Sequence, residues 1–417
     1  MGLYLGKENS RSQNIKIMSD TTKTPSALAQ RNAISRIWND SESRSVIVQI
    51  IAAVLVFAFF AYVVRNAMVN LEALGKSFSF SFLSQASSYD INQHLIEYTS
   101  RSSHFRAMQV GILNTLLVAV SGIILATILG FTLGVLRLSK NWLTNKLAYV
   151  YIEYVRNVPL LLHILLVHGV LVHTLPIPKK AIVVGEGAFL TNRGFFLPKP
   201  EYEPLFWIVA ALIVAGIIFA YFFKKHATQV QEQTGKIYPV FWICLAAIVG
   251  VPFLVYFLLG SPITWNIPEL KGFNYKGGMV VRPEFIALWF ALSLYTAAFI
   301  GEIVRAGITA VSYGQSEASA ALGINRSRTL SLVVIPQALR IIIPPLTSQY
   351  LNLAKNSSLA VAIGYMDIVA TIGGISLNQT GREMECMSIV LLLYLTMSLT
   401  ISSAMNWYNS RMKLVER

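Results

Sequence analysis

The sequence predicts an all-α polytopic membrane protein. Of its 417 residues, 54% are hydrophobic and only 13% are charged, against about 25% charged in an ordinary soluble domain. Several apolar runs reach the roughly 20 residues that a helix needs to cross the hydrocarbon layer. The net charge of +14 comes from Lys and Arg that lie singly between these runs, without the base-stacking pattern of a nucleic-acid surface. The composition therefore excludes a soluble domain and favours a membrane protein with basic connections.

Eight membrane spans are expected, which puts both termini on the same side of the membrane. The stretch 137–157 is expected to be a basic turn, and the Pro- and Gly-punctuated stretches 176–204 and 261–283 are expected to be loops. The expected spans are 46–64, 110–136, 158–175, 207–223, 240–259, a span from about 285 to 302, an apolar region at about 359–375, and 388–407.

Two features predict how these spans behave. Gly130 and Gly134 in the second span form a small-residue pair that lets helices approach closely, and simple packing is the favoured interpretation. Pro344 and Pro345, followed by a polar run that starts at Lys355, predict a broken helix.

Lys and Arg are denser in one set of connecting segments than in the other. The denser set contains both termini and the central loop, so the positive-inside rule places these parts in the cytoplasm. Residues 1–45 are polar and are expected to form a cytoplasmic tail rather than a cleavable signal peptide. Met18 is a candidate alternative start. The two cysteines, Cys244 and Cys386, lie in or beside apolar segments, so neither a disulfide framework nor a metal site is expected.

The polar stretch from Arg305 to Ser358 contains a predicted helix of about two turns. Ser316 is a plausible N-cap for it, Glu317 lies near the positive end of the helix dipole, and Gly323 is the C-terminal stop. So short a helix is marginal alone in water. One of its faces carries the small or apolar side chains Ala318, Ala321 and Leu322. This face is suited to close docking against a partner.

Charged residues near membrane depth are candidates for a substrate path. Glu302 and Arg305 are three residues apart at a predicted helix end, where a structural ion pair and a role beside the path are both open. Lys355, with Asn356, Ser357 and Ser358, must face protein or a water-filled cavity, or else extend its ammonium group to the interface. Backbone groups exposed by a broken helix could meet the carboxylate or amino group of an amino acid.

Two other polar patterns favour structural roles. Glu153 and Arg156 are spaced to pair on one helical face. Three histidines recur at intervals of five residues, which rotates each about 140° from the last, so they cannot converge on one metal. These are His163, His168 and His173.

No catalytic constellation is visible, and no cofactor is expected. The nearest approach to a phosphate loop is Gly75-Lys76-Ser77, but Asn70 stands where the first glycine should be. The chain is therefore expected not to be an enzyme, and any ATP hydrolysis would belong to a separate subunit.

The central motifs resemble a known family. Glu317-Ala318-Ser319, with Gly323 and then Pro336, is similar to the EAA loop of ABC importer permeases. Three flanking segments narrow the resemblance to the polar amino acid permeases; they are Glu302–Gly307, Pro336–Arg340 and Lys355–Leu359. The departures from the family pattern are mild; they are Ser319, Val333, Ile335 and Ser357.

This resemblance implies a type I importer core with an inserted helix pair, and an ATPase-coupling loop at Glu317, Ala318, Ser319, Gly323 and Pro336. It implies partners: ATP-binding cassette ATPase subunits, a second permease, a periplasmic amino-acid-binding protein and an L-amino acid substrate. The greater length resembles the longer permease of the general L-amino-acid importer. The implied layout is a cytoplasmic tail (1–45), an extra helix and periplasmic segment (46–109), the first part of the core (110–175), an insertion (176–284), the second part of the core with the cytoplasmic loop (285–407) and a tail (408–417).

An alternative remains open from the residues alone. A self-contained secondary transporter or channel could use Glu302, Lys355 and Asp367 as an ion or proton relay. It would leave the helix around Glu317 without a task.

Overall fold

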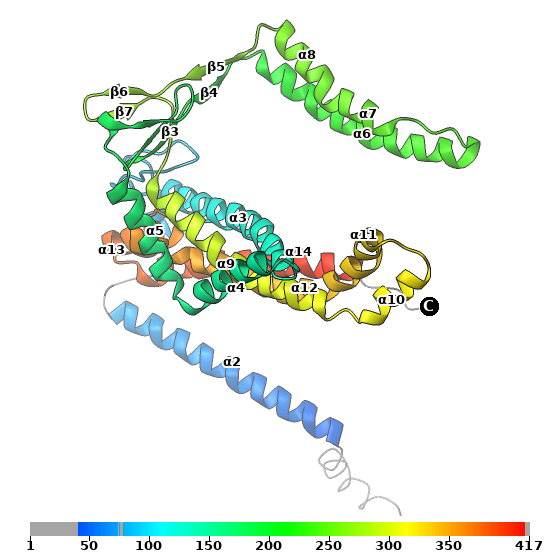
Figure 1. Ribbon diagram of the computed structural model, residues 1–417. Coiled ribbons are helices and arrows are strands. Elements are labelled where there is room, and N and C mark those ends of the chain that lie inside the picture. Colours follow the sequence, from blue (N-terminus) through cyan, green and yellow to red (C-terminus); the bar gives the residue numbers. More distant parts are fainter. Residues whose placement is uncertain (1–40, 74, 76–77, 413–417) are drawn as a thin grey trace, which may run out of the picture. The chain divides into compact units, whose positions relative to one another are not determined.

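The computed structural model describes residues 41–73, 75 and 78–412 (Figure 1). The chain divides into two compact units, residues 1–78 and 79–417. In the first unit, the described residues form the long apolar helix α2 (Ser41–Ala73). Most of the predicted cytoplasmic tail, and the candidate start at Met18, lie outside the described residues. The second unit contains all the other elements.

The structure is mostly helical, and the prediction of a helical, polytopic membrane protein with about eight spans is confirmed. Among the described residues, seven helices are long and apolar enough to cross a membrane, and one bent helix pair can supply an eighth span. One predicted span is placed wrongly, however. The crossing helix of this region runs over Arg326–Ile363, not over 359–375. Most of the stretch taken as a polar loop is therefore span, because its polar residues are spread along a helix that is apolar on average.

The core is built on two helices that run in the same direction, α3 (His104–Leu136) and α9 (Pro283–Thr309). A Cβ atom at Gly130 would lie 2.5 Å from the side chain of Ile300, and one at Gly134 would lie 2.6 Å from that of Val304. Only glycine allows this approach. The predicted packing role of the glycine pair is confirmed, and the partner helix is α9 of the same chain.

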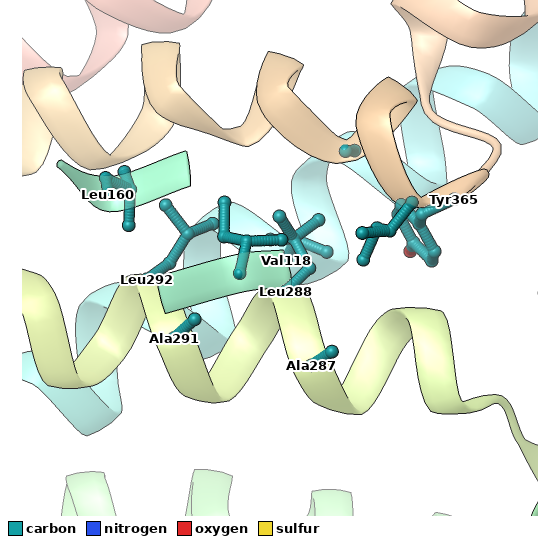
Figure 2. Close-up of a cluster of buried hydrophobic side chains, with 10 residues drawn as sticks. Val118, Leu160, Ala287, Leu288, Ala291, Leu292 and Tyr365 are labelled. Atoms are coloured by element: carbon teal, nitrogen blue, oxygen red, sulfur yellow. The ribbon is translucent and has the colours of Figure 1, made fainter. Parts of the chain in front are cut away.

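A buried cluster joins α3 and α9 to neighbouring segments. Figure 2 shows Leu288 and Leu292 of α9 facing Val118 of α3, with Leu160 and Tyr365 at either side. These side chains come from segments that range from position 118 to position 365 of the sequence. Burial of such apolar surface holds the elements of the core together.

The last third of the chain packs onto this pair. Helix α12 (Ile335–Asn356) contacts α9 and α14 (Glu383–Met412). Pro344 and Pro345 lie inside α12 rather than at its end, so the predicted break is not at the prolines. It comes at Ser357, where the backbone tightens into a 3₁₀ helix. The connecting elements are α11 (Arg326–Thr329), η4 (Leu330–Val334), η5 (Ser357–Ile363), η6 (Val369–Ser376) and α13 (Leu377–Thr380).

The expected basic turn at 137–157 is wrong, because most of it is helix α4 (Trp142–Asn157). It meets α5 (Leu160–Thr174) at a bend of 106° just before Pro159, where proline disfavours a continuous helix. The predicted ion pair in α4 does not form between these two described residues. Glu153 instead accepts hydrogen bonds from the amide of Asn157, and the guanidinium of Arg156 lies over the ring of Phe299.

The stretches 176–204 and 261–283 are not simply loops. They fold together into short antiparallel strands, one group before and one group after an inserted helix pair (Figure 1). One sheet has the order β1-β2-β3-β8; β4 pairs with β5, and β6 with β7. The strands are β1 (Ile182–Val183), β2 (Phe189–Thr191), β3 (Gly194–Leu197), β4 (Lys199–Tyr202), β5 (Ile263–Asn266), β6 (Glu269–Lys271), β7 (Asn274–Lys276) and β8 (Met279–Val281).

The inserted pair consists of α6 (Phe206–Thr234) and a second helix interrupted by one π turn. That second helix comprises α7 (Val240–Leu245), η3 (Ala246–Gly250) and α8 (Val251–Leu258). The π turn ends two residues before Pro252, which has no N–H for the helical ladder. A Cβ at Gly216 would lie 2.4 Å from the carbonyl oxygen of Ala247, so the two helices touch backbone to backbone. Two shorter 3₁₀ turns are η1 (Ser81–Ser84) and η2 (Pro178–Lys180).

Candidate functional site

The short helix predicted around Glu317 exists, but it begins earlier than expected. It is α10 (Tyr313–Ala321), and its N-cap is Ser312 rather than Ser316. Glu317 therefore lies in the second turn. The predicted stop is confirmed, because Gly323 has φ +72°, the left-handed conformation that ends many helices.

Helix α10 is almost wholly exposed. Tyr313 and Leu322, one at each end, are 76% and 78% exposed. Glu317, Ala318 and Ala321 are exposed as well. Ser319 is the buried exception at 4%. The face that was predicted to dock is thus open along its length in the isolated chain.

Among the described residues, one side-chain hydrogen bond joins α10 to the span that follows it, and two others are local to the loop. The hydroxyl of Ser319 donates to the carbonyl of Gln315 at 2.8 Å. The amide of Gln337 in α12 donates to the side-chain oxygen of Gln315 at 3.2 Å. Next along the chain, Asn325 caps α11 by accepting from the N–H of Arg328 at 2.9 Å. The loop is therefore fixed to the span that follows it.

Pro336 has a clear backbone role beside this loop. It lies in the first turn of α12, directly after the π turn η4. The helix continues through this point, from Arg326 to Ile363, and the wider π turn accommodates the ring of a proline that removes one N–H from the helical ladder. Pro336 therefore shapes the path of the chain from α10 into the span.

Glu302 and Arg305 form a close ion pair near the α10 end of α9. The arginine donates three hydrogen bonds to the carboxylate, at 2.6, 3.0 and 3.1 Å. Both side chains are half-buried. Arg137 and Arg156 add positive charge at the same carboxylate. This end of the core therefore carries more positive than negative charge.

The other path candidates lie at the end of α12. Lys355 is exposed and Asn356 half-buried. The hydroxyl of Ser357 is buried and donates to the carbonyl of Ala354, and that of Ser358 donates to the carbonyl of Lys355, both at 2.8 Å. The serine hydroxyls thus satisfy backbone carbonyls where the α-helix tightens, and Lys355 keeps a free surface.

The structure does not bring the two groups of candidates together. Leu353 lies two residues before Lys355 and packs against Gly122 of α3. Ser293 of α9 packs against the same glycine. Ser293 is nine residues before Glu302, which is about 14 Å along an α-helix. Glu302 and Lys355 therefore lie at different depths of the core.

Some features of the site were missed in the sequence. No local pattern relates Gln315 to Gln337, 22 residues apart, so their contact could not be predicted. Arg137 lies near Glu302, but its segment was predicted to be a turn. Its place at the end of a long apolar run was the sequence feature that could have assigned it to the end of a span. Among the described residues, no group of His, Cys, Asp and Glu could hold a metal ion.

The helical core and the exposed α10 define a class: a multi-pass membrane protein with a short helix presented outside its spans. Residues 213–414 match the family of binding-protein-dependent transport system inner membrane components. One solved structure, that of an amino acid ABC transporter with histidines, aligns with a TM-score of 0.43 and 20% identity over 74% of this chain and 95% of that chain.

Three curated relatives are similar over nearly the whole length. The general L-amino acid transport system permease protein AapQ of Rhizobium johnstonii is 47% identical, covering 91% of this chain and 94% of the relative. The putative amino-acid ABC transporter permease protein YhdX of Escherichia coli is 45% identical, over 90% and 95%. The permease BztB of a glutamate/glutamine/aspartate/asparagine transport system in Rhodobacter capsulatus is 46% identical, over 92% and 97%. The chain belongs to the family of amino-acid ABC transporter permeases.

Proposed function

We propose that this chain is the membrane permease subunit of an ABC importer that translocates polar or general L-amino acids across the inner membrane. Three full-length relatives named for amino-acid transport support the substrate class. The breadth of those names, from general L-amino acids to four acidic and amide amino acids, favours a range of polar substrates over a single one.

The ATPase-coupling site of this importer is α10 with its flanking residues. The observation that carries this assignment is exposure: a nine-residue helix, too short to be stable alone, presents Tyr313 and Leu322 to solvent at 76% and 78%. Large apolar side chains on such a helix favour a partner surface. The coupling residues are Glu317, Ala318, Ser319, Gly323 and Pro336; of these, Ser319 and Pro336 hold the loop and the others meet the partner.

The partners follow from this role. ATP-binding cassette ATPase subunits would bind α10, a second homologous permease would complete the pore, and a periplasmic binding protein would deliver the amino acid. Both termini and α10 would face the cytoplasm, as the distribution of Lys and Arg favours. Glu302 and Lys355 to Ser358 would line the path at two depths. Between the two tails, the proposed layout is an extra helix with a periplasmic segment (46–109), the first part of the core (110–175), the insertion (176–284) and the second part of the core (285–407).

The direct test is to purify the tagged protein from its native membrane, with and without Glu317→Lys. We expect an ATPase subunit to co-purify with the wild type and to be lost with the variant, because an ammonium group then replaces the exposed carboxylate and reverses the charge that the partner meets. Glu232→Lys is the matched control, since Glu232 is exposed on the polar end of α6 and should keep the ATPase bound.

The same experiment can also support the alternative function. If the chain purifies alone and transports amino acids alone in liposomes, it is a stand-alone secondary transporter or channel. The Glu302, Lys355 and Asp367 relay would then need testing, and α10 would not be a coupling helix.

A further inference from the structure

A polar pocket of about 470 Å³ lies at the end of the core opposite α10. Helix α9 leads from the strands at Met279–Val281 to α10, and α3 runs parallel to it, so His104 at the start of α3 marks the far end. One wall of the pocket comes from η1 and the extended chain after it, and the other from α13 and the turn into α14. The segments that form it are therefore distant in sequence and meet only in the fold.

His104 forms the floor of this pocket and is held rigidly. It is 2% exposed, and its Nδ1 lies 2.8 Å from the hydroxyl of Ser376. Tyr89 approaches the same hydroxyl at 3.0 Å and the carbonyl of Thr371 only at 3.5 Å. Either hydroxyl can be the donor between Tyr89 and Ser376; where Tyr89 donates, the serine proton is left for Nδ1 of His104. The hydrogen of the imidazole is then on Nε2, the nitrogen that Ser376 does not engage.

The walls of the pocket are rich in hydrogen-bond donors. In the described part of the chain, none of the side chains that line it is acidic. The amides, hydroxyls and guanidinium belong to Ser81, Gln85, Ser88, Gln379, Thr380 and Arg382. Behind the wall, Glu385 is buried and already accepts from the N–H of Ser79 at 2.9 Å and from Arg382 at 3.3 Å, so its charge is engaged there.

A donor-rich, open pocket without a carboxylate of its own suits an anionic group that accepts several hydrogen bonds. We propose that this pocket binds a small molecule through a carboxylate, with His104 Nε2–H and the amides of Gln85 and Gln379 as donors. It is a site separate from the path candidates at Glu302 and Lys355. Amino acids carry such a carboxylate, and so do simple dicarboxylates; both should therefore compete for it.

Thiol labelling of the full chain in native membranes tests this proposal. Gln379→Cys places a thiol on the rim, and Ser81→Cys provides a second rim position in case the first variant does not fold. The unsubstituted chain, with half-buried Cys244 and buried Cys386, gives the background. The reagent is a small methanethiosulfonate, and the probes are L-glutamate, glutarate and 1,5-diaminopentane.

We expect L-glutamate and glutarate to slow labelling, and the diamine to leave it unchanged. At twice its dissociation constant a ligand that covers the thiol slows labelling about threefold, since one site in three stays free. Protection by glutamate without protection by glutarate would overturn the proposal, because recognition would then need the amino group. Protection by the diamine, or by none of the probes, would overturn it too.

A charge variant separates this pocket from any other amino-acid site. Gln85→Glu puts a carboxylate into the wall at an exposed position, and among the described residues the side chain of Gln85 makes no hydrogen bond that would be lost, so we expect protection to disappear. Asn92→Asp adds the same charge at an exposed residue outside the pocket and should keep it. If Gln85→Glu keeps full protection, the ligand lies elsewhere. Labelling needs neither ATP nor transport, so this result is independent of the proposed importer function.

Discussion

Two short segments between long helices contrast in almost every respect. Helix α10 is exposed, and its carboxylate, Glu317, points to solvent. The segment from Gly364 to Ser376, which includes η6, is buried against α3 and α14, and its carboxylate, Asp367, is 1% exposed. Asp367 accepts from the N–H of Ala370 at 2.8 Å and from the hydroxyl of Tyr394 at 3.5 Å. A carboxylate in a short segment is thus exposed to solvent in one place and engaged by the fold itself in the other.

This contrast predicts opposite effects on stability. Asp367→Ala removes the acceptor of a buried backbone N–H and leaves a cavity, so we expect it to lower the free energy of unfolding by about 3 kcal/mol. Glu317→Ala removes an exposed side chain and should change it by less than about 0.5 kcal/mol. Thermal unfolding of the purified protein in detergent measures both.

Asp367→Asn is the control for that experiment. It keeps a side-chain oxygen for the N–H of Ala370, so most of the stability should return. Equal losses in Asp367→Ala and Glu317→Ala would show that the burial of η6 does not set the difference between the two segments.

A second prediction uses one glycine beside each segment. A Cβ at Gly111 of α3 would lie 2.3 Å from the hydroxyl of Thr371 and 3.0 Å from the backbone of Ile368, so Gly111→Ala should cost about 1–3 kcal/mol through overpacking. A Cβ at Gly314 of α10 would find its nearest atom at 3.6 Å. Gly314→Ala should therefore be neutral or gain up to about 1 kcal/mol from helix propensity.

The shift in unfolding temperature of the two alanine variants decides this point. We expect Gly111→Ala to lower the unfolding temperature and Gly314→Ala to leave it unchanged or raise it, because only the first added Cβ overlaps neighbouring atoms. A Gly111→Ala protein as stable as the wild type would mean that the segment near Thr371 moves away at little cost, and that its packing on α3 is loose.

The smallest effect is a dependence on pH. Asp367 lies between the candidate spans that end at Ile363 and begin at Glu383, and burial raises its pKa to about 7. The unfolded value is about 3.9. Because the folded state holds the proton more tightly, this group favours folding at low pH, and its contribution is lost as the pH rises through 7. The free energy of unfolding should fall by about 1 kcal/mol from pH 6 to pH 8.

Comparing the wild type with Asp367→Asn isolates that contribution. The unfolding temperature of the wild type should decrease over this pH range, and the variant should lack that part of the decrease. Identical pH profiles would show that another group controls the titration.

Hydropathy predicted the positions of most membrane spans, but the structure of the segments that connect them was predicted wrongly. Runs such as Val46–Val64 and Val240–Leu259 stand out because crossing the bilayer imposes about 20 apolar residues. The span of Arg326–Ile363 was missed because its polar residues suggested a loop. The strands around Phe196 and Val280 were read as loops because their pairing depends on residues about 80 positions apart, which no local pattern contains.

The sequence by itself determined that this is a helical membrane protein, which segments are apolar, and that a short helix with Glu317 ends at Gly323. These properties follow from transfer free energies and local backbone preferences, which act within a few neighbouring residues. Only the tertiary structure decided that α10 is exposed while η6 is buried, that Glu302 and Lys355 lie apart, and that His104 and Gln379 share a pocket. Burial and proximity depend on contacts between distant segments, and these exist only once the chain has folded.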